Sequence, residues 1–229
     1  MALALRAVGS SIAQVFTHGA ASILSNIVTF LLSIPLLLFI GVAAYPSRSW
    51  SLIPFGAALL VGVLPCPAGL AAHGVARILA RDEDLELRRH LREQRQFLVP
   101  ALKCWLAAIG ITAVIALNLA YYSQSGLPIA ASLEILWLLV LLLWFAVNLY
   151  VLPLILDQDD KRVLPVYRNA VVMAVGRPGF ALVVLPVWLA ELTLTSATGL
   201  TTVIGFILGA SIQQNAFIRL VPTFNRAKA

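Results

Sequence analysis

Long, nearly uninterrupted apolar stretches are the feature of this 229-residue sequence that most restricts its fold. A helix needs roughly 20 apolar residues to cross about 30 Å of membrane hydrocarbon. The stretches of about that length cover residues 23–45, 52–72, 104–122, 133–156, 180–197 and 200–218. We therefore predict an all-α fold, a polytopic membrane helical bundle with six transmembrane helices. Residues 1–229 form one membrane domain, with spans 1 to 3 in 23–122 and spans 4 to 6 in 133–218. The last two stretches are so close that a single re-entrant unit is the alternative.

The composition favours a membrane protein as well. Hydrophobic residues make up 61% of the chain and charged residues 11%, whereas soluble domains contain about 45–50% and about 25%. The formal net charge is +6, and the basic residues lie beside the apolar stretches. In that position they orient the spans and contact anionic lipid headgroups. We therefore expect membrane lipids as partners and no nucleic acid.

The distribution of Lys and Arg predicts the orientation. If the N-terminus is cytoplasmic, every Lys and Arg except Arg48 falls in a cytoplasmic segment of the six-span arrangement. Cytoplasmic segments of membrane proteins carry an excess of these residues. Changing the span count by one would destroy this asymmetry, so we predict six spans with both termini inside.

The N-terminal segment, residues 1–20, precedes the first span and has amphipathic character. Leu5, Val8 and Ile12 recur near helical spacing, with polar residues between them. This pattern predicts an amphipathic helix lying in the cytoplasmic membrane interface. A helix that packs against the bundle as a partial seventh member is the alternative.

We predict a cytoplasmic helix at residues 83–98, between spans 2 and 3. Acidic residues lie at the start of this segment and basic residues toward its end, which suits the helix dipole. We expect Arg88, Arg92 and Phe97 to form a surface for a partner protein, since arginine and aromatic side chains dominate interfaces. Attachment to anionic lipid is the alternative. Residues 157–179 repeat the same order of charges, which fits either an ancient duplication or ordinary helix capping.

Few residues in the spans carry chemistry. Glu191 lies well inside the fifth stretch and is either a proton or cation site or a side chain that reaches the outer headgroups. Gly205 and Gly209 form a small-xxx-small pair that favours close helix packing, within the bundle or with a partner. Cys66 and Cys104 are expected to be packed free thiols. The three histidines have no metal-ligand spacing and no catalytic motif occurs, so we expect no enzyme, no cofactor and no metal.

Four passages resemble a known family. They are Asn26 with the apolar run to Pro35, the Pro-Ala-Gly-rich stretch 65–72 leading to Arg77, the passage from Asn148 to Pro153, and Asn169-Ala170 before Pro178. In order and spacing they resemble the YesL-like family of bacterial integral membrane proteins, a domain of unknown function. The chain departs from that family at Leu64, where a glycine is usual, and in its Arg/Leu-rich rather than aromatic-rich cytoplasmic helix.

The resemblance implies a location in the bacterial inner membrane and an accessory role beside a carbohydrate ABC importer. We therefore expect a non-enzymatic accessory membrane protein with a membrane-protein partner. Two other functions stay open. One is a small subunit that stabilises a larger membrane complex, through the Gly205–Gly209 face and the amphipathic N-terminus. The other is a small secondary transporter that uses Glu191.

Overall fold

The computed structural model describes residues 1–44, 66–81, 92–125, 128–198 and 205–226. Within these ranges all regular structure is helical and no strand occurs, so the predicted all-α class is confirmed. The helices are α1 (Ala2–Thr17), α2 (Gly19–Ala44), η3 (Pro67–Gly69), α4 (Leu70–Ala80), η4 (Arg95–Phe97), α6 (Leu98–Gln124), α7 (Ala130–Asp157), α8 (Val163–Gly176), α9 (Pro178–Thr198) and α10 (Gly205–Arg226).

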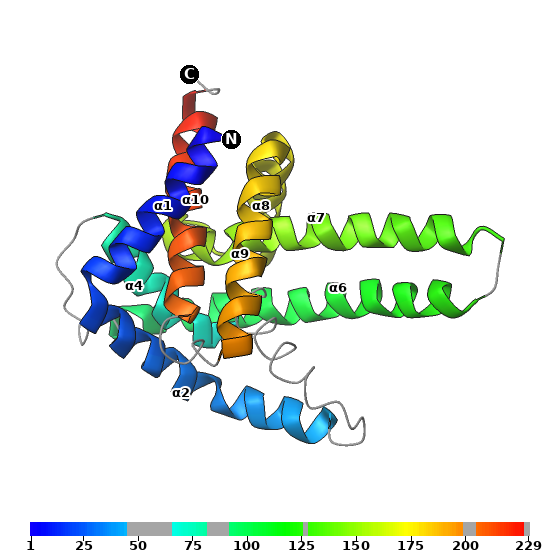
Figure 1. Cartoon of the computed structure of the whole chain (residues 1–229), viewed down its shortest axis with the longest axis horizontal. Coiled ribbons are helices and arrows are strands. Elements are labelled where there is room, and N and C mark those ends of the chain that lie inside the picture. Colours follow the sequence, from blue (N-terminus) through cyan, green and yellow to red (C-terminus); the bar gives the residue numbers. More distant parts are fainter. Residues whose placement is uncertain (45–65, 82–91, 126–127, 199–204, 227–229) are drawn as a thin grey trace.

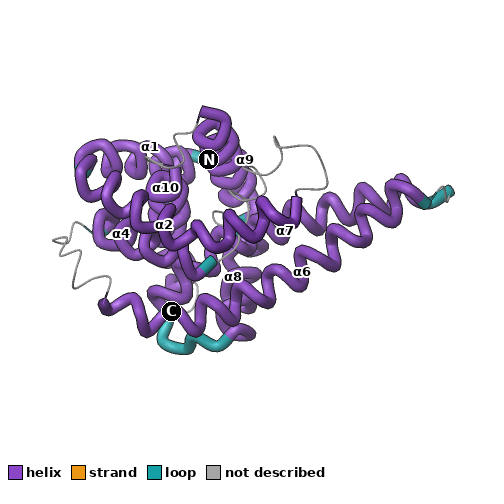
Figure 2. Tube along the Cα trace, turned by 90° about the horizontal axis from the view of Figure 1, so that it is seen from below, coloured by secondary structure: helices purple, strands orange, loops and turns teal. Residues whose placement is uncertain are grey.

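Helices α6 and α7 pack side by side as a hairpin that projects from the rest of the molecule (Figures 1 and 2). The helical segment that contains α6 runs from Arg92 to Gln124, and α7 has 28 residues. At 1.5 Å per residue, 28 residues extend about 42 Å, which exceeds the hydrocarbon thickness of a bilayer. Both helices are long and apolar enough to cross a membrane.

A third candidate span arises only if α8 and α9 are counted together. These helices are bent by 101° at the break that precedes Pro178. Proline is well placed there because the first position of a helix needs no backbone N–H donor. The predicted stretch 52–72 lies mostly outside the described residues, and so does residue 199, between the last two predicted spans.

The outer part of the hairpin exposes large apolar side chains. Leu117 is 70% exposed on α6, and Leu139 is 58% exposed on α7. Soluble monomers rarely expose contiguous apolar patches of more than a few hundred Å², whereas a bilayer solvates such a surface. The length of the two helices and the character of their surface together indicate a membrane protein.

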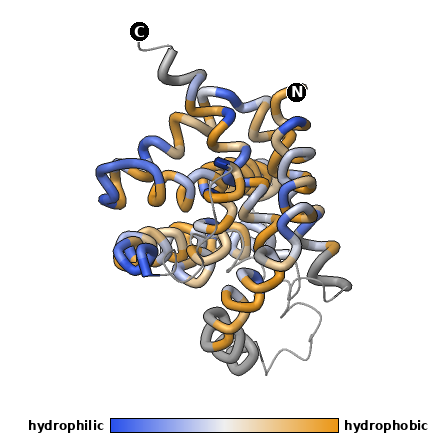
Figure 3. Tube along the Cα trace, turned by 90° about the vertical axis from the view of Figure 1, so that its left-hand side faces the viewer, coloured by the Kyte–Doolittle hydropathy of each residue, from blue (hydrophilic) through white to orange (hydrophobic). Residues whose placement is uncertain are grey.

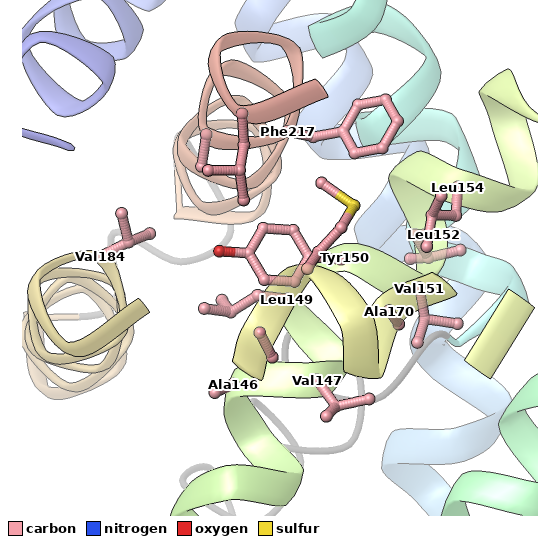
Figure 4. Packing of buried hydrophobic residues seen from close by; sticks show 14 of the residues in the cluster. Ala146, Val147, Leu149, Tyr150, Val151, Leu152, Leu154, Ala170, Val184 and Phe217 are labelled. Carbon is pink, nitrogen blue, oxygen red and sulfur yellow. The ribbon is translucent and has the colours of Figure 1, made fainter. Parts of the chain in front are cut away.

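The inner half of α7 joins α1, α4, α8, α9 and α10 in a compact body, the name used below for these elements. Every residue of α7 from Ala146 to Leu156 is buried. Tyr150 lies at the centre of this packing, with Val184 of α9 and Phe217 of α10 around it (Figure 4). Helix α7 thus anchors the exposed hairpin in the packed body, together with the start of α6, where Ala101 and Cys104 are buried in the same core.

Helix α1 packs lengthwise on α10 (Figure 1) and also contacts α9. Figure 3 shows hydrophilic and hydrophobic residues alternating along it. Its buried face is made of the small residues Ala4, Ala7, Ser11 and Val15, while Leu5 and Phe16 face outward. Of the two interpretations of residues 1–20, the position of α1 fits the helix that packs against the bundle.

Candidate functional site

The interior between α1, α2, α4 and α10 is rich in polar side chains, although the outer faces of α1 and α2 expose apolar ones. The buried polar residues there are Ser11, Ser22, Ser25, Asn26, Thr29, His73, Ser211, Gln213, Gln214 and Asn215. This distribution is the reverse of that in a soluble protein. It is typical of membrane helices, whose polar side chains bond to one another inside the bundle.

Asn215 joins α10 to α1. Its Nδ2 group donates to Ser11 Oγ at 3.1 Å and to Gln14 Oε1 at 2.8 Å. Gln14 Nε2 donates in turn to the carbonyl oxygen of Leu79 in α4, at 3.1 Å. Asn26 of α2 accepts a hydrogen bond from the backbone N–H of Ile207 at 3.0 Å. These bonds join α10, near the end of the chain, to α1 and α2 at its start, and they join α1 to α4.

His73 is the titratable side chain of this interior that lies deepest, with 3% of its surface exposed. Its Nδ1 atom lies 3.0 Å from the carbonyl oxygen of Gly69, one turn earlier in the chain. Its Nε2 atom lies 3.0 Å from Oε1 of Gln213 in α10. Because a carbonyl oxygen only accepts hydrogen bonds, Nδ1 carries a hydrogen. The other ring nitrogen, Nε2, is held in place by its contact with the Gln213 amide.

Glu191 and Trp188 of α9 approach the same place from the other side. A Cβ atom added to Gly209 would lie 3.0 Å from Trp188 Nε1 and 3.2 Å from Glu191 Oε2. The structure therefore places Gly209 at the closest approach of α9 and α10. Gly205 is buried one turn earlier on the same helix, so both glycines of the predicted pair lie inside this chain's own packing.

A small cavity separates these groups. It is lined by Gly69, Ala72, His73, Trp188, Glu191, Gly205, Phe206, Gly209, Ala210 and Gln213. The space open to the centre of a water-sized sphere is about 10 Å³, which is room for about one water molecule. His73 and Glu191 are the titratable residues of this lining, and we call this place the His73–Glu191 cavity.

Ion pairs hold the end of α7. Asp157 Oδ1 lies 3.0 Å from Nη2 of Arg77, on α4, and 2.5 Å from Nη2 of Arg81, which directly follows α4. Just beyond, the Arg162 side chain donates to the Asp160 carboxylate at 2.6 Å. This hydrogen bond holds the pKa of Asp160 below its ordinary value.

The structure revises the prediction of a partner surface at Arg88, Arg92 and Phe97. Arg88 lies outside the described residues, and Arg92 is exposed. Phe97 is only 9% exposed and packs in the core, with Lys161 Nζ 5.2 Å from the centre of its ring. Our expectation of Phe97 as a surface anchor was therefore wrong. The helix also continues through residue 98 into α6, where we had expected a boundary.

A larger groove lies at the base of the hairpin, between α6, α7 and α8. It has a volume of about 360 Å³, and its lining includes Gly110, Trp137, Trp144 and Val171. Trp144 is held by a hydrogen bond from its Nε1 to Thr112 Oγ1 at 2.9 Å and by stacking on Tyr167. No charged residue lines the groove, so it suits an apolar ligand or helix.

Glu191 was the one member of the His73–Glu191 cavity that the sequence singled out as ionisable. His73 and Gln213 were missed because they are 140 residues apart in the chain. One signal was present inside the predicted sixth span: four polar residues, Ser211, Gln213, Gln214 and Asn215, interrupted only by Ile212. The thiols of Cys66 and Cys104 are free and buried.

Comparison of the chain with protein-family models, with curated proteins and with solved structures finds no match. The resemblance to the YesL-like family accordingly stays a prediction.

Proposed function

We propose that this protein is a non-enzymatic accessory membrane protein that assists or regulates a transport system through contacts within the membrane. The observation that carries this proposal is the contrast between two spaces in the part of the chain that the structure describes. The polar His73–Glu191 cavity has room for about one water, whereas the groove beside Trp144 measures about 360 Å³ and is apolar. A transporter needs a polar site of the size of its solute, whereas an accessory protein needs an apolar surface for a partner helix.

The groove suits a transmembrane helix of the partner. It lies on the hairpin that is exposed and long enough to cross the bilayer. Gly110 lines it, and a Cβ atom at Gly110 would meet nothing within 4 Å. Small residues let the backbones of membrane helices approach closely. The carbohydrate ABC importer named by the resemblance is the expected source of the partner helix.

The test is a Gly110→Leu substitution, which adds a side chain at the lining of the groove, from a position where the Cβ atom itself meets nothing within 4 Å. Gly9→Leu is the matched control, because Gly9 lies in α1 away from the groove and also has nothing within 4 Å of its Cβ position. Tagged proteins are purified from their native host in mild detergent, and co-purifying subunits are quantified by mass spectrometry. We expect a membrane subunit of an ABC importer to accompany the wild type and the Gly9→Leu variant, and to be lost from Gly110→Leu. Equal recovery with both variants, or no importer subunit with any of them, would overturn the proposal.

Two alternatives are tested by the same proteins. A small subunit that stabilises a larger complex predicts that the partner unfolds or is degraded when this protein is deleted, whatever its transport activity. A small secondary transporter predicts solute uptake by the purified protein alone in lipid vesicles. In that case Glu191→Gln should abolish uptake, because Glu191 is the carboxylate of the polar cavity.

We also propose the six-span arrangement in the bacterial inner membrane with both termini in the cytoplasm. The placement of Lys and Arg supports it, whereas the course of α10 across the direction of α6 (Figure 1) argues for fewer spans. Single cysteines in a background without Cys66 and Cys104 decide between them. An impermeant thiol reagent applied to intact cells should label Arg48→Cys and Ser125→Cys but not Arg162→Cys. If only Ser125→Cys is labelled, the two helices of the hairpin, α6 and α7, are the only ones that cross the membrane.

A further inference from the structure

Two titratable side chains from distant parts of the chain share one small cavity, and nothing in the proposed accessory function uses them. We propose that the His73–Glu191 cavity is a proton-binding site, in which Glu191 receives a proton from solution and passes it through one water molecule to His73. The site is assembled from α4, α9 and α10, whose contacts hold the body together.

The surroundings of His73 suit both of its charge states. In the neutral ring, Nδ1–H donates to the Gly69 carbonyl and Nε2 accepts from the Gln213 amide group. In the protonated ring, both nitrogens donate, and the carbonyl oxygen of Gln213 accepts from Nε2; both ring nitrogens lie 3.0 Å from their partners. A glutamine amide carries donors and an acceptor at opposite ends. Gln213 is therefore a positioning residue that accommodates either state by turning its amide.

Glu191 supplies the compensating charge. A buried imidazolium is costly unless a negative charge lies nearby, and Glu191 is the carboxylate in the cavity lining. Its Oε2 atom is buried, although the residue as a whole is partly exposed. Glu191 thus reaches from the surface of the body to the cavity, while His73 lies at the inner end.

The transfer needs no further reactant. A hydronium ion in solution gives its proton to the Glu191 carboxylate and becomes water. The acid then passes a proton to the cavity water, which gives one to Nε2 of His73. The net change is one proton bound by the protein, with the Glu191 carboxylate restored beside the imidazolium. A cavity of about 10 Å³ holds the single water that this path requires.

The other ionisable groups named here, on α4 and on the elements packed around it, lie outside the lining of the cavity. Arg77 on α4 and Arg81, which directly follows it, pair with Asp157 of α7. Tyr150 of α7 lies in the apolar core, Cys66 precedes η3, Arg6 of α1 is exposed, and Arg219 of α10 donates to Ser10 Oγ at 3.2 Å. The sequence of α2 contains no ionisable side chain. None of these residues lines the cavity.

The test follows the protonation of His73 directly. The full-length protein is labelled with ¹⁵N-histidine and purified in detergent, and the imidazole signals are recorded between about pH 4 and pH 9, a range that brackets ordinary His and Glu titration. His73→Gln identifies the signal among the three histidines of the chain. Glu191→Gln removes the charge while keeping the shape, and Glu134→Gln is the matched control on the hairpin.

We expect the His73 signal to titrate in the wild type and in Glu134→Gln with the same midpoint. In Glu191→Gln the midpoint should fall by about one pH unit or more, since a nearby carboxylate stabilises an imidazolium by at least that much. A His73 signal that does not change over the whole range would overturn the proposal. So would a midpoint that Glu191→Gln leaves where it is in the wild type. Because the measurement uses the isolated protein, its outcome does not depend on any partner.

Discussion

Gly209→Ala tests whether α9 and α10 approach as closely as the structure indicates. The added methyl group would lie 3.0 Å from Trp188 Nε1 and 3.2 Å from Glu191 Oε2. Trp188 is only 1% exposed, and the space beside its ring is the small cavity that it lines, which has room for about one water. Overpacking of this kind costs about 1–3 kcal/mol. Replacing a helical glycine by alanine contributes about 1 kcal/mol in the opposite direction.

Gly9→Ala is the control, because it gains the same helix propensity and its Cβ meets nothing within 4 Å. We expect the unfolding free energy of Gly209→Ala to lie about 1–3 kcal/mol below that of Gly9→Ala. In a chain of this size, 1 kcal/mol moves the Tm by about 2–4 °C. Thermal unfolding in detergent, followed by tryptophan fluorescence, measures this difference. If Gly209→Ala raises the Tm as much as Gly9→Ala does, the close contact between the two helices is refuted.

Three further predictions concern the part of the protein around Phe97, Asp157 and Arg162. Phe97→Ala should lower the unfolding free energy by about 3–5 kcal/mol in chemical denaturation, because the ring is buried beneath Lys161; a stable variant that only loses a partner would restore the surface hypothesis. Asp157→Asn should cost about 1 kcal/mol, since its partners Arg77 and Arg81 are partly exposed, and the cost should vanish when both arginines are already replaced by glutamine. Arg162→Gln should raise the lowered pKa of Asp160 toward its ordinary value in a carboxyl NMR titration, while the backbone N–H of residue 162 still donates to the carboxylate. The stabilisation from this pair is present above the ordinary carboxyl pKa and is lost as the pH falls through the lowered value, so a pKa unchanged by Arg162→Gln would contradict the assignment.

Apolar patterning predicted the long helices well, because their lengths follow from the sequence itself. The stretch 133–156 became α7 (Ala130–Asp157), and 23–45 became α2 (Gly19–Ala44). Both ends of α7 fall where the apolar run gives way to polar or turn-forming residues. Local composition determines such boundaries, so no knowledge of the neighbouring helices was needed.

The polar cavity escaped prediction because it depends on contacts between distant segments. His73 was judged by its spacing from other metal ligands, yet its partner Gln213 is an amide on α10. The prediction that Phe97 lies on an exposed partner surface failed for a related reason. Its helical segment was expected to face a partner protein, but Lys161, from the connection after α7, covers the ring. Periodicity identifies which face of a helix is apolar, and it leaves open which segment packs on that face.

The hydrogen bonds between α1 and α10 have a consequence for how the protein is made. Ser11 and Asn215 are separated by 204 residues, so at about 5–20 residues per second the ribosome supplies the second residue about 10–40 s after the first. The hairpin of α6 and α7 joins neighbouring segments and forms as soon as both have emerged. During the whole interval, however, Ser11 and Gln14 lack the amide of Asn215 that they bind in the finished body. A membrane insertase or chaperone that shields these polar faces would therefore act on the nascent chain until α10 arrives and closes the structure.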